Sequence, residues 1–227
     1  MAAHGHPTVA AILVAAGDGV RLGGAVPKAF TVIRGRTLLA HALVPFRACD
    51  AVRDVVVVAP GLYVAHAAAL LSDEVTTVAG GPTRQASVSF GLAAVATDVD
   101  TVLVHDVARP FVPVEVVDRV LAALAEGGAD AVIPTRPVTD TIKQVDEEGA
   151  VVATLDRSEL RVVQTPQGFR RAVLEAAHAA GVGRNFTDDA ALVEAHGGQV
   201  AVVDGADEAF KITRPWDLAL AEAVAGR

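Results

Sequence analysis

The sequence predicts an α/β fold in which a mainly parallel sheet lies between two layers of helices. Short, continuous runs of β-branched apolar residues recur along the chain, as they do in strands that are buried on both faces. Amphipathic segments of helical length separate these runs, which is typical of βαβ units. The chain has 227 residues, of which 52% are hydrophobic, so we expect one domain over residues 1–227 with a sizeable core.

These patterns assign the elements in chain order. The apolar runs predict strands at residues 9–16, 54–59, 74–79, 100–106, 130–135, 160–165 and 199–204. The segments between them predict helices, several of which begin near a Thr or Pro, at residues 37–48, 62–71, 84–96, 113–125, 170–180, 187–196 and 214–226.

One segment breaks this alternation of strands and helices. Residues 137–160 are polar and alternating, and they turn at Glu148-Gly149, as a two-stranded β-hairpin does. We expect this hairpin to project from the sheet as an arm and, through its VVATL stretch, to pack on a second subunit of a homodimer. A surface hairpin on a monomer is the alternative.

Composition excludes several classes of function. The formal net charge of −8 argues against a nucleic-acid surface, which gains affinity from many basic groups. No apolar run approaches the ~18 residues that a bilayer requires, and no segment resembles a signal peptide, so we expect a soluble, cytoplasmic protein without membrane contact. The single cysteine, Cys49, cannot form an internal disulfide.

The loop after the first predicted strand carries the clearest functional signal. Ligands of parallel sheets bind beyond the carboxyl ends of the strands, and residues 13–30, LVAAGDGVRLGGAVPKAF, lie there. Glycines let backbone N–H groups surround an anion, and basic side chains add positive charge. The residues concerned are Gly17, Gly19, Gly23, Gly24, Arg21 and Lys28. The loop therefore predicts a polyphosphate site.

Other known motifs do not fit these letters. A P-loop needs lysine after its last glycine, but Ala25 follows Gly24. The dinucleotide fingerprint fails because Leu22 occupies the place of its third glycine. A nucleophile elbow is approached only by SVSFG at residues 87–91, which begins with Ser where that motif has Gly.

Several motifs, in order, carry a resemblance to a known family. They are AAGDGVRLG (15–23) with Pro27-Lys28, HDVARPF (105–111), PVTDTIK (137–143), DRSEL (156–160), QTPQGF (164–169), FTDDA (186–190) and FKITRPWDLALAE (210–222). Together they resemble the 2-C-methyl-D-erythritol 4-phosphate cytidylyltransferase family of the non-mevalonate isoprenoid pathway, over nearly the whole chain. The resemblance implies a three-layer, Rossmann-like nucleotidyltransferase fold and transfer of a cytidylyl group from CTP to methylerythritol phosphate, with release of pyrophosphate.

The residues that would hold the triphosphate can be named from the motifs. Arg21 and Lys28 would neutralise charge on the phosphates, and the resemblance adds Lys211 as a third catalytic cation. Asp106 ends a predicted strand and would place a carboxylate at the site, suited to Mg²⁺ or another divalent cation that bridges phosphates. The neighbouring His105 is expected to be structural, because an attacking phosphate needs little deprotonation.

The resemblance also implies residues for the two substrates. The nucleotide-binding positions are Ala15, Ala16, Gly17, Gly19, Gly81, Ser87 and Asp106. The positions for the acceptor phosphate and its surroundings are Arg109, Thr141, Arg157, Thr165 and Thr187. Arg157 lies on the arm and in the family enters the neighbouring subunit's pocket, so a homodimer would have composite sites. Thr187 could instead cap the helix that follows it.

Three alternatives remain open at this point. A ribitol 5-phosphate cytidylyltransferase, or another sugar or polyol phosphate nucleotidyltransferase, would share the fold, the loop and the metal. A molybdopterin-type guanylyltransferase is disfavoured by the spacing before Pro27-Lys28 and by QTPQ. A non-catalytic nucleotide sensor would keep the glycine loop without needing Lys28, Asp106 and Lys211 together.

Overall fold

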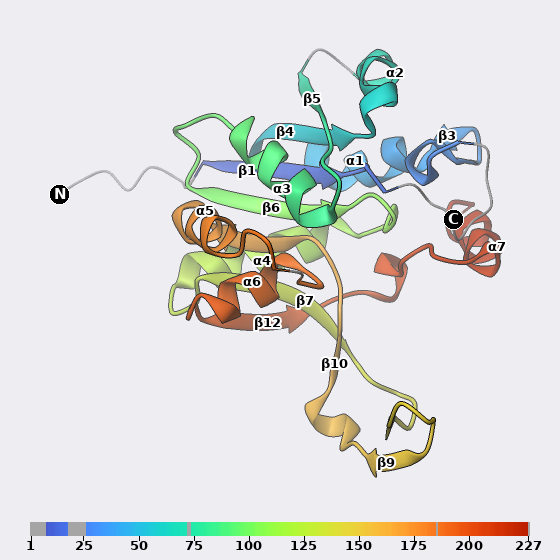
Figure 1. The fold of residues 1–227 in the computed structure, drawn as a ribbon. Helices are drawn as coiled ribbons and strands as arrows, with labels where there is room; N and C mark the ends of the chain where they lie inside the picture. The colour runs from blue at the N-terminus through green and yellow to red at the C-terminus, as the bar shows by residue number, and fades with distance from the viewer. Residues whose placement is uncertain (1–7, 18–25, 72–73, 185, 227) are drawn as a thin grey trace.

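The apolar runs of the sequence form the central sheet of the molecule. The computed structural model describes residues 8–17, 26–71, 74–184 and 186–226. In these residues the predicted runs become strands β1 (Val9–Val14), β4 (Val52–Ala59), β5 (Val75–Ala79), β6 (Thr101–Asp106), β7 (Ala131–Pro137), β10 (Arg161–Val163) and β12 (Val200–Asp204). The strand order is β10-β7-β11-β6-β1-β4-β5, and β12 pairs with β7 (Figure 1). The predicted α/β class with a mainly parallel sheet is confirmed.

Strands β10 and β11 (Gln167–Arg170) depart from the simple parallel pattern. β11 lies between β6 and β7 and runs antiparallel to both, and β10 is antiparallel to β7. The sequence did not predict β11, since its four residues include Gly168 and glycine is a weak strand former. A Cβ at Gly168 would lie 2.6 Å from Val120 Cγ1, so the glycine allows helix α4 (Val114–Glu126) to approach the sheet closely.

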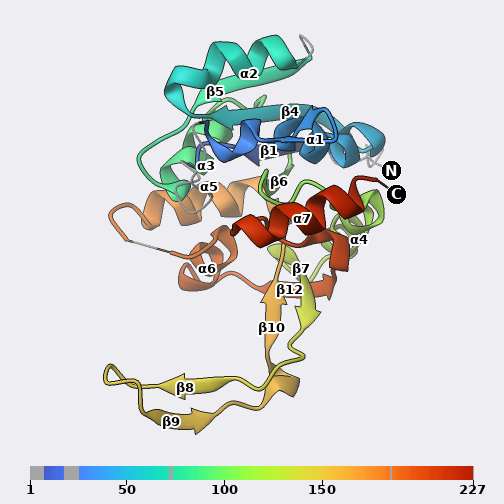
Figure 2. The same ribbon diagram turned by 90° about the vertical axis from the view of Figure 1, so that its right-hand side faces the viewer.

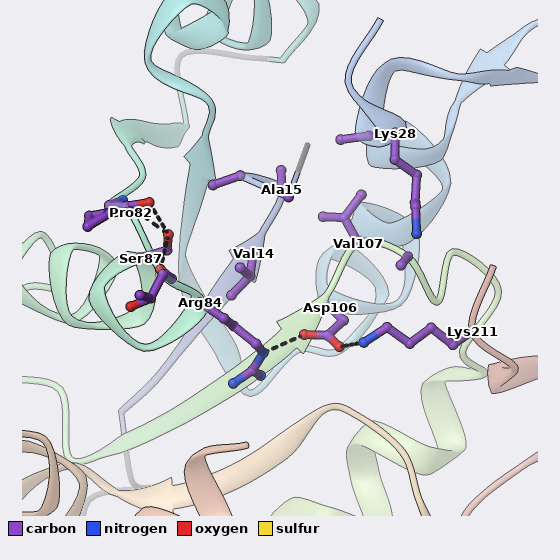
Figure 3. A pocket seen from close by; sticks show the side chains of 15 residues that line it. Val14, Ala15, Lys28, Pro82, Arg84, Ser87, Asp106, Val107 and Lys211 are labelled. Atoms are coloured by element: carbon purple, nitrogen blue, oxygen red, sulfur yellow. Dashed lines mark hydrogen bonds and ion pairs between the residues drawn. The ribbon is translucent and has the colours of Figure 1, made fainter. Parts of the chain in front are cut away.

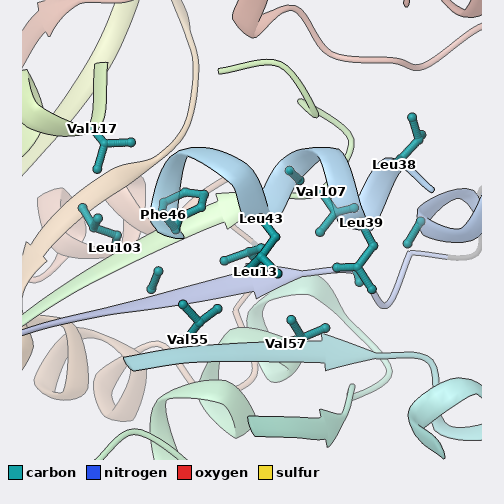
Figure 4. Packing of buried hydrophobic residues seen from close by; sticks show 14 of the residues in the cluster. Leu13, Leu38, Leu39, Leu43, Phe46, Val55, Val57, Leu103, Val107 and Val117 are labelled. Atoms are coloured by element: carbon teal, nitrogen blue, oxygen red, sulfur yellow. The ribbon is translucent and has the colours of Figure 1, made fainter. Parts of the chain in front are cut away.

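Helices cover both faces of the sheet because residues along each strand alternate between the faces. On β1, Ala11 and Leu13 face the side of α1 (Leu38–Ala48) and α4, where Phe46 is fully buried (Figure 4). Ala10 and Ile12 face the opposite layer. That layer consists of α3 (Arg84–Ala93), α5 (Arg171–Ala180) and α6 (Asp189–Ala195). Each large side chain buried in this way contributes about 1.5–3 kcal/mol.

Two further helices lie at the margins of these layers. They are α2 (Val64–Leu70), which packs beside β5, and α7 (Pro215–Val224), which lies near the small hairpin β2 (Val32–Ile33) and β3 (Arg36–Thr37). No helix in the described ranges combines the length and the apolar character needed to span a bilayer.

Strand register brings the carboxyl ends of β1, β4 and β6 to one edge of the sheet. Val14, the last residue of β1, lies opposite Asp106 on β6 and Val58 on β4. Side chains that follow these strands therefore meet at this edge, where the sequence placed the phosphate loop.

The predicted arm is present and projects from the body of the molecule (Figures 1 and 2). Its strands β8 (Lys143–Val145) and β9 (Val151–Thr154) pair antiparallel. Gly149 has a φ of +85°, in the region that favours glycine, which confirms the predicted turn. All the residues of β8 and most of β9 are exposed, so the hairpin has little packing within its own chain.

Candidate active site

A pocket of about 560 Å³ opens at the carboxyl edge of the sheet. Several of the residues expected to bind a nucleotide line it: Ala15, Ala16, Gly17, Lys28, Gly81, Ser87, Asp106 and Lys211. Figure 3 shows Arg84 and Lys211 reaching Asp106 from opposite sides, with Lys28 beside them. Gly19 and Arg21 lie outside the described residues.

Asp106 is the acidic residue among the described residues that line this pocket. Its Oδ1 accepts a hydrogen bond from Arg84 Nε at 3.0 Å, and its Oδ2 accepts one from Lys211 Nζ at 2.7 Å. Burial alone would raise the pKa of Asp106, but the charges of Arg84 and Lys211 outweigh it and hold the pKa well below its usual range. The carboxylate is therefore ionised and fixed in place at neutral pH.

The backbone of Asp106 is held from the other side of the strand. Thr165 Oγ1 accepts from Asp106 N at 3.1 Å and donates to His105 Nδ1 at 2.9 Å. His105 Nε2 then donates to the Arg109 carbonyl at 3.1 Å. Burial lowers the pKa of His105 to about 4, so this histidine is neutral and its two nitrogens support the loop after β6. This agrees with the structural role expected for it.

Lys28 begins the short 3-10 helix η2 (Lys28–Phe30), and its position depends on residues far along the chain. Lys28 Nζ donates to the Ile212 carbonyl at 2.8 Å. The Ile212 N–H in turn donates to the Ala108 carbonyl at 2.8 Å. Two residues on, the buried Phe30 stacks on Tyr63 with ring centroids 5.0 Å apart. These contacts bring the lysine loop, the loop after β6 and the segment of Lys211 together.

The segment that carries Lys211 is fixed by the first turn of α7. Asp217 Oδ2 accepts hydrogen bonds from Thr213 N at 2.6 Å, Thr213 Oγ1 at 2.9 Å and Arg214 N at 2.8 Å. Burial raises the pKa of Asp217, but the hydrogen bonds from Thr213 and Arg214 lower it further than burial raises it. The chain just after Lys211 thus has a defined path.

The opposite wall of the pocket is made of small groups. Ser87 is buried, and its hydroxyl accepts from Gly81 N at 3.1 Å and donates to the Thr83 carbonyl at 2.9 Å. A Cβ at Gly81 would lie 2.6 Å from Ala86 Cβ, which is too close for a side chain. Pro82 stands beside this turn and lines the pocket. The turn is therefore compact and presents main-chain groups to a ligand.

Sequence reasoning missed Arg84 and Asp189. Arg84 lines the pocket and joins Asp106 to Asp189, donating from Nη1 to Asp189 Oδ2 at 2.6 Å. One signal was available: Arg84 is the first residue of α3, where the helix dipole disfavours a cation unless a carboxylate is near. Asp189 is the second acid of the FTDDA motif, and the letters alone do not say which acid points inward.

The residues expected to bind the acceptor phosphate do not line this pocket in the single chain. Thr141 and Arg157 are exposed on the arm, and Thr187 is exposed just before α6. Thr165 is buried beneath Asp106, and the Arg109 guanidinium donates to the carbonyls of Ala209 and Val163. The alternative role of Thr187 as a helix cap is wrong, because Asp188 caps α6 by accepting from Ala191 N at 3.0 Å.

No group of three or more metal-binding side chains occurs within the part of the chain that is described. Asp106 alone among the described lining residues offers a carboxylate to the pocket. That donor set suits Mg²⁺, which keeps several waters and is held through one or two carboxylates together with substrate phosphates. Two oxygens with two lone pairs each leave Asp106 further acceptor capacity beside its bonds to Arg84 and Lys211.

Comparison with known proteins gives a consistent result over the whole described chain. Residues 9–227 match the family model described as 2-C-methyl-D-erythritol 4-phosphate cytidylyltransferase. The enzyme of that name from Frankia casuarinae is 52% identical over 221 residues, covering 97% of this chain and 82% of that protein. The enzyme of that name from Rhodococcus jostii is 51% identical over 222 residues, covering 98% and 97%.

Solved structures show the same similarity. The 2-C-methyl-D-erythritol 4-phosphate cytidylyltransferase of Thermus thermophilus superposes with a TM-score of 0.79 at 42% identity, covering 96% of this chain and 98% of the other. The 4-diphosphocytidyl-2C-methyl-D-erythritol synthase of Anaerococcus prevotii superposes with a TM-score of 0.85 at 27% identity, covering 98% and 100%.

Proposed function

The chain belongs to the 2-C-methyl-D-erythritol 4-phosphate cytidylyltransferase family, and we propose how its residues carry out the family reaction. The enzyme transfers a cytidylyl group from CTP to 2-C-methyl-D-erythritol 4-phosphate and releases pyrophosphate. The observation that carries the proposal is the convergence of Lys28, Asp106 and Lys211 on one pocket at the carboxyl edge of the sheet.

CTP would bind with its triphosphate near Lys28 and Lys211 and its base near the wall of the pocket that contains Gly81 and Ser87. Lys28 and Lys211 supply two ammonium groups, and we assign Arg21 and the N–H groups of Gly17 and Gly19 to the same phosphates. The turn at Gly81 and Ser87, together with Ala15 and Ala16, leaves a narrow space lined by main-chain groups. Such a space favours a pyrimidine over the larger purine.

The reaction is an in-line displacement that needs positioning and charge neutralisation more than a covalent catalyst. A phosphate oxygen of the acceptor forms a bond to the α-phosphorus, the bond from that phosphorus to the bridging oxygen breaks, and its electron pair leaves with pyrophosphate. The attacking oxygen is already ionised, so no general base is required, which agrees with the buried, neutral His105. Lys28 and Lys211 stabilise the charge that develops on the phosphoryl oxygens.

Asp106 would hold Mg²⁺ or another divalent cation, which when bound neutralises charge on the triphosphate. Arg84 and Lys211 keep the carboxylate ionised and oriented for that task. Removal of divalent cations with a chelator should abolish pyrophosphate release, and added Mg²⁺ should restore it. Full activity in the presence of the chelator would contradict this role of Asp106.

The acceptor half of the site would be completed by a second subunit. Three valines on the arm, Val145, Val151 and Val152, are 53%, 61% and 62% exposed, so the arm has an apolar surface without cover in its own chain. We propose that the arm packs on a partner and brings Thr141 and Arg157 to the edge of the partner's pocket, which Lys211 lines. Thr187, Thr165 and Arg109 do not line the pocket of the single chain, and we assign them to the surroundings of the acceptor phosphate. We propose a cytoplasmic location for this homodimer.

The decisive experiment measures pyrophosphate release with CTP, Mg²⁺ and each of two acceptors. Methylerythritol phosphate should support turnover, and ribitol 5-phosphate at equal concentration should support far less. The reverse preference would move the enzyme to the ribitol reaction. Binding of CTP without turnover on either acceptor would favour a nucleotide sensor.

A further inference from the structure

A row of alternating charges runs from the pocket into the opposite helical layer. Lys211 contacts Asp106 at 2.7 Å, Asp106 contacts Arg84 at 3.0 Å, and Arg84 contacts Asp189 at 2.6 Å. His178 Nε2 on α5 then donates to Asp189 Oδ1 at 3.0 Å. The five groups come from five separate segments of the chain, and the four charged residues Lys211, Asp106, Arg84 and Asp189 form the row.

Asp189 is the buried end of this row that does not reach the pocket. It has 0% exposure, and both of its carboxylate oxygens accept hydrogen bonds, one from Arg84 and one from His178. A buried ion pair of this kind gives little net stability, because taking charges out of water costs about as much as their attraction returns. The position of Asp189 is therefore better explained by what it does to Arg84.

We propose that Asp189 is a positioning residue for cytidylyl transfer, acting through Arg84 on Asp106. This inference rests on the function proposed above. The guanidinium of Arg84 is planar and can be fixed by two acceptors at once. Here Nε donates to Asp106 and Nη1 donates to Asp189. With Asp189 in place, the side chain of Arg84 is held in one orientation, so its Nε holds the Asp106 carboxylate toward the pocket.

Charge balance supports the same conclusion. Without Asp189, the carboxylate of Asp106 alone would face the two cations Arg84 and Lys211. With Asp189, two carboxylates face these two cations. Asp189 then balances part of the positive charge of Arg84, so Arg84 cancels less of the negative charge of Asp106. Asp106 can then act on a bound cation or on the ammonium of Lys211 as a full carboxylate.

The start of α6, where Asp189 lies, also carries a residue assigned to the acceptor. Thr187 lies two positions earlier, and between them Asp188 caps α6 and accepts from Gln167 Nε2 at 2.7 Å. The neighbouring aspartates thus have different tasks. Asp188 holds the helix end and Asp189 holds Arg84, which makes Asp188 the matched control.

The test compares Asp189→Asn, Arg84→Lys, the double variant and Asp188→Asn in the full-length enzyme. Asparagine keeps the shape of Asp189 but removes its charge, and we expect kcat to fall about 20-fold with a smaller change in KM for CTP. Arg84→Lys should lower kcat about 50-fold, and the double variant no further than Arg84→Lys, because residues that act through one another are not additive. Asp188→Asn keeps the cap to Ala191 N but loses the acceptor for Gln167 Nε2, so its unfolding midpoint should fall while kcat stays within about twofold.

A spectroscopic readout separates positioning from a merely structural role. In the wild type the Nε–H of Arg84, bonded to Asp106, should give a protected arginine side-chain resonance, assigned by its loss in Arg84→Lys. It should broaden or vanish in Asp189→Asn and persist in Asp188→Asn, while circular dichroism shows that both variants are folded.

Each outcome decides the question. Additive effects in the double variant, or an unchanged Arg84 resonance with unchanged kcat in Asp189→Asn, would overturn the proposal. If Asp189→Asn does not fold, Arg84→Lys carries the test, and wild-type kcat in that variant would also overturn it. Failure of the proposed function is distinguishable, because the wild type would then release no pyrophosphate from CTP and methylerythritol phosphate.

Discussion

The corner around Asp106 and the arm differ in how far a single chain completes them. At the corner, Asp106 is 8% exposed and lies between two cations, above a buried threonine and a neutral histidine. On the arm, β8 and β9 form one hairpin whose valines are more than half exposed. One region is organised before any ligand arrives, and the other has an apolar surface without cover in its own chain.

In the proposed function, the two substrates therefore make different demands on the protein. The nucleotide half of the site needs rigid charges, and the sheet edge supplies them from within one chain. In the proposed function the acceptor half uses Thr141 and Arg157, which are exposed on the arm and do not line the pocket of their own chain. We therefore expect a substitution near Asp106 to inactivate the pocket of the chain that carries it. A substitution on the arm should instead inactivate the pocket of the partner chain.

The largest effect is expected for Lys28→Ala. Removing a charged donor that stabilises the transferred phosphoryl group should lower kcat by about a thousandfold, equivalent to ~3–5 kcal/mol. Loss of the hydrogen bond from Lys28 Nζ to the Ile212 carbonyl should lower the thermal unfolding midpoint by no more than a few degrees. Pyrophosphate release under saturating CTP and Mg²⁺ measures the first quantity, and circular dichroism measures the second.

Arg53→Ala is a suitable control for that experiment. Arg53 pairs with Asp54 and Asp98 on the surface, and none of the three lines the pocket. Its kcat should equal that of the wild type. Turnover of Lys28→Ala within a fewfold of the wild type would remove this lysine from the mechanism.

The second prediction tests whether the arm acts in trans. Arg157→Ala should lower kcat/KM for the acceptor about a hundredfold, because a charge-assisted bond to phosphate is lost. Mixing this variant with Lys28→Ala, followed by subunit exchange, should recover about a quarter of wild-type activity. Half of the dimers are then mixed, and each mixed dimer has one intact pocket facing one intact arm.

The same mixing experiment would also show whether Arg157 acts on the pocket of its own chain. If Arg157 served the pocket of its own chain, a mixed dimer would contain no intact site and activity would not return. Sedimentation of the variants, alone and mixed, checks that subunits associate. A monomeric wild type at assay concentration would contradict the composite site.

A smaller effect is expected for Gly81→Ala in the small wall of the pocket. The new Cβ would lie 2.6 Å from Ala86 Cβ and 3.2 Å from Phe90 Cε2, so the turn must shift. We expect KM for CTP to rise about tenfold with a smaller change in kcat, as for a loss of ground-state binding. Gly149→Ala on the arm is the comparison variant, and it should leave KM for CTP unchanged.

The sequence predicted most of the fold because its signals are local. Apolar runs and turn residues identified the strands that run parallel and the arm, including the turn at Gly149. Strand β11 was not predicted because it depends on tertiary packing. Gly168 leaves room for the side chain of Val120, and no local sequence pattern shows this contact. A strand of this kind is recognised only once the helix that packs on it is placed.

The site residues also divide into those with a local sequence signal and those without one. Lys28 and Asp106 could be named because Lys28 lies in the glycine-rich loop after the first strand and Asp106 ends β6, and the structure brings both to one pocket. Arg84 and Asp189 could not, because their importance lies in a contact between α3 and α6 across 105 residues of chain. Residues that touch a ligand leave a motif, whereas residues that hold those residues are visible only in three dimensions.

The smallest predicted effect concerns Asp217, which shows how local contacts fix the corner. Its carboxylate accepts three hydrogen bonds from Thr213 and Arg214, just beyond Lys211, and these bonds lower its pKa despite burial. A lowered folded-state pKa means that the carboxylate stabilises the fold above the unfolded pKa of about 4, and that this stability is lost as the pH falls through the folded value. Asparagine can keep the hydrogen bonds to one oxygen but lacks the negative charge that the first turn of a helix favours. Asp217→Asn should therefore lower the free energy of unfolding by about 0.5 kcal/mol at pH 7, and the difference from wild type should shrink toward pH 2.

Thermal unfolding at several pH values measures this difference. A constant difference between Asp217→Asn and the wild type from pH 7 to pH 2 would show that lost packing, not the charge, is responsible. Turnover should fall no more than about twofold, since Lys211 is also held by Asp106. On the exposed arm, by contrast, the polar contact of Lys143 with Thr154 should be removable without effect on an isolated chain.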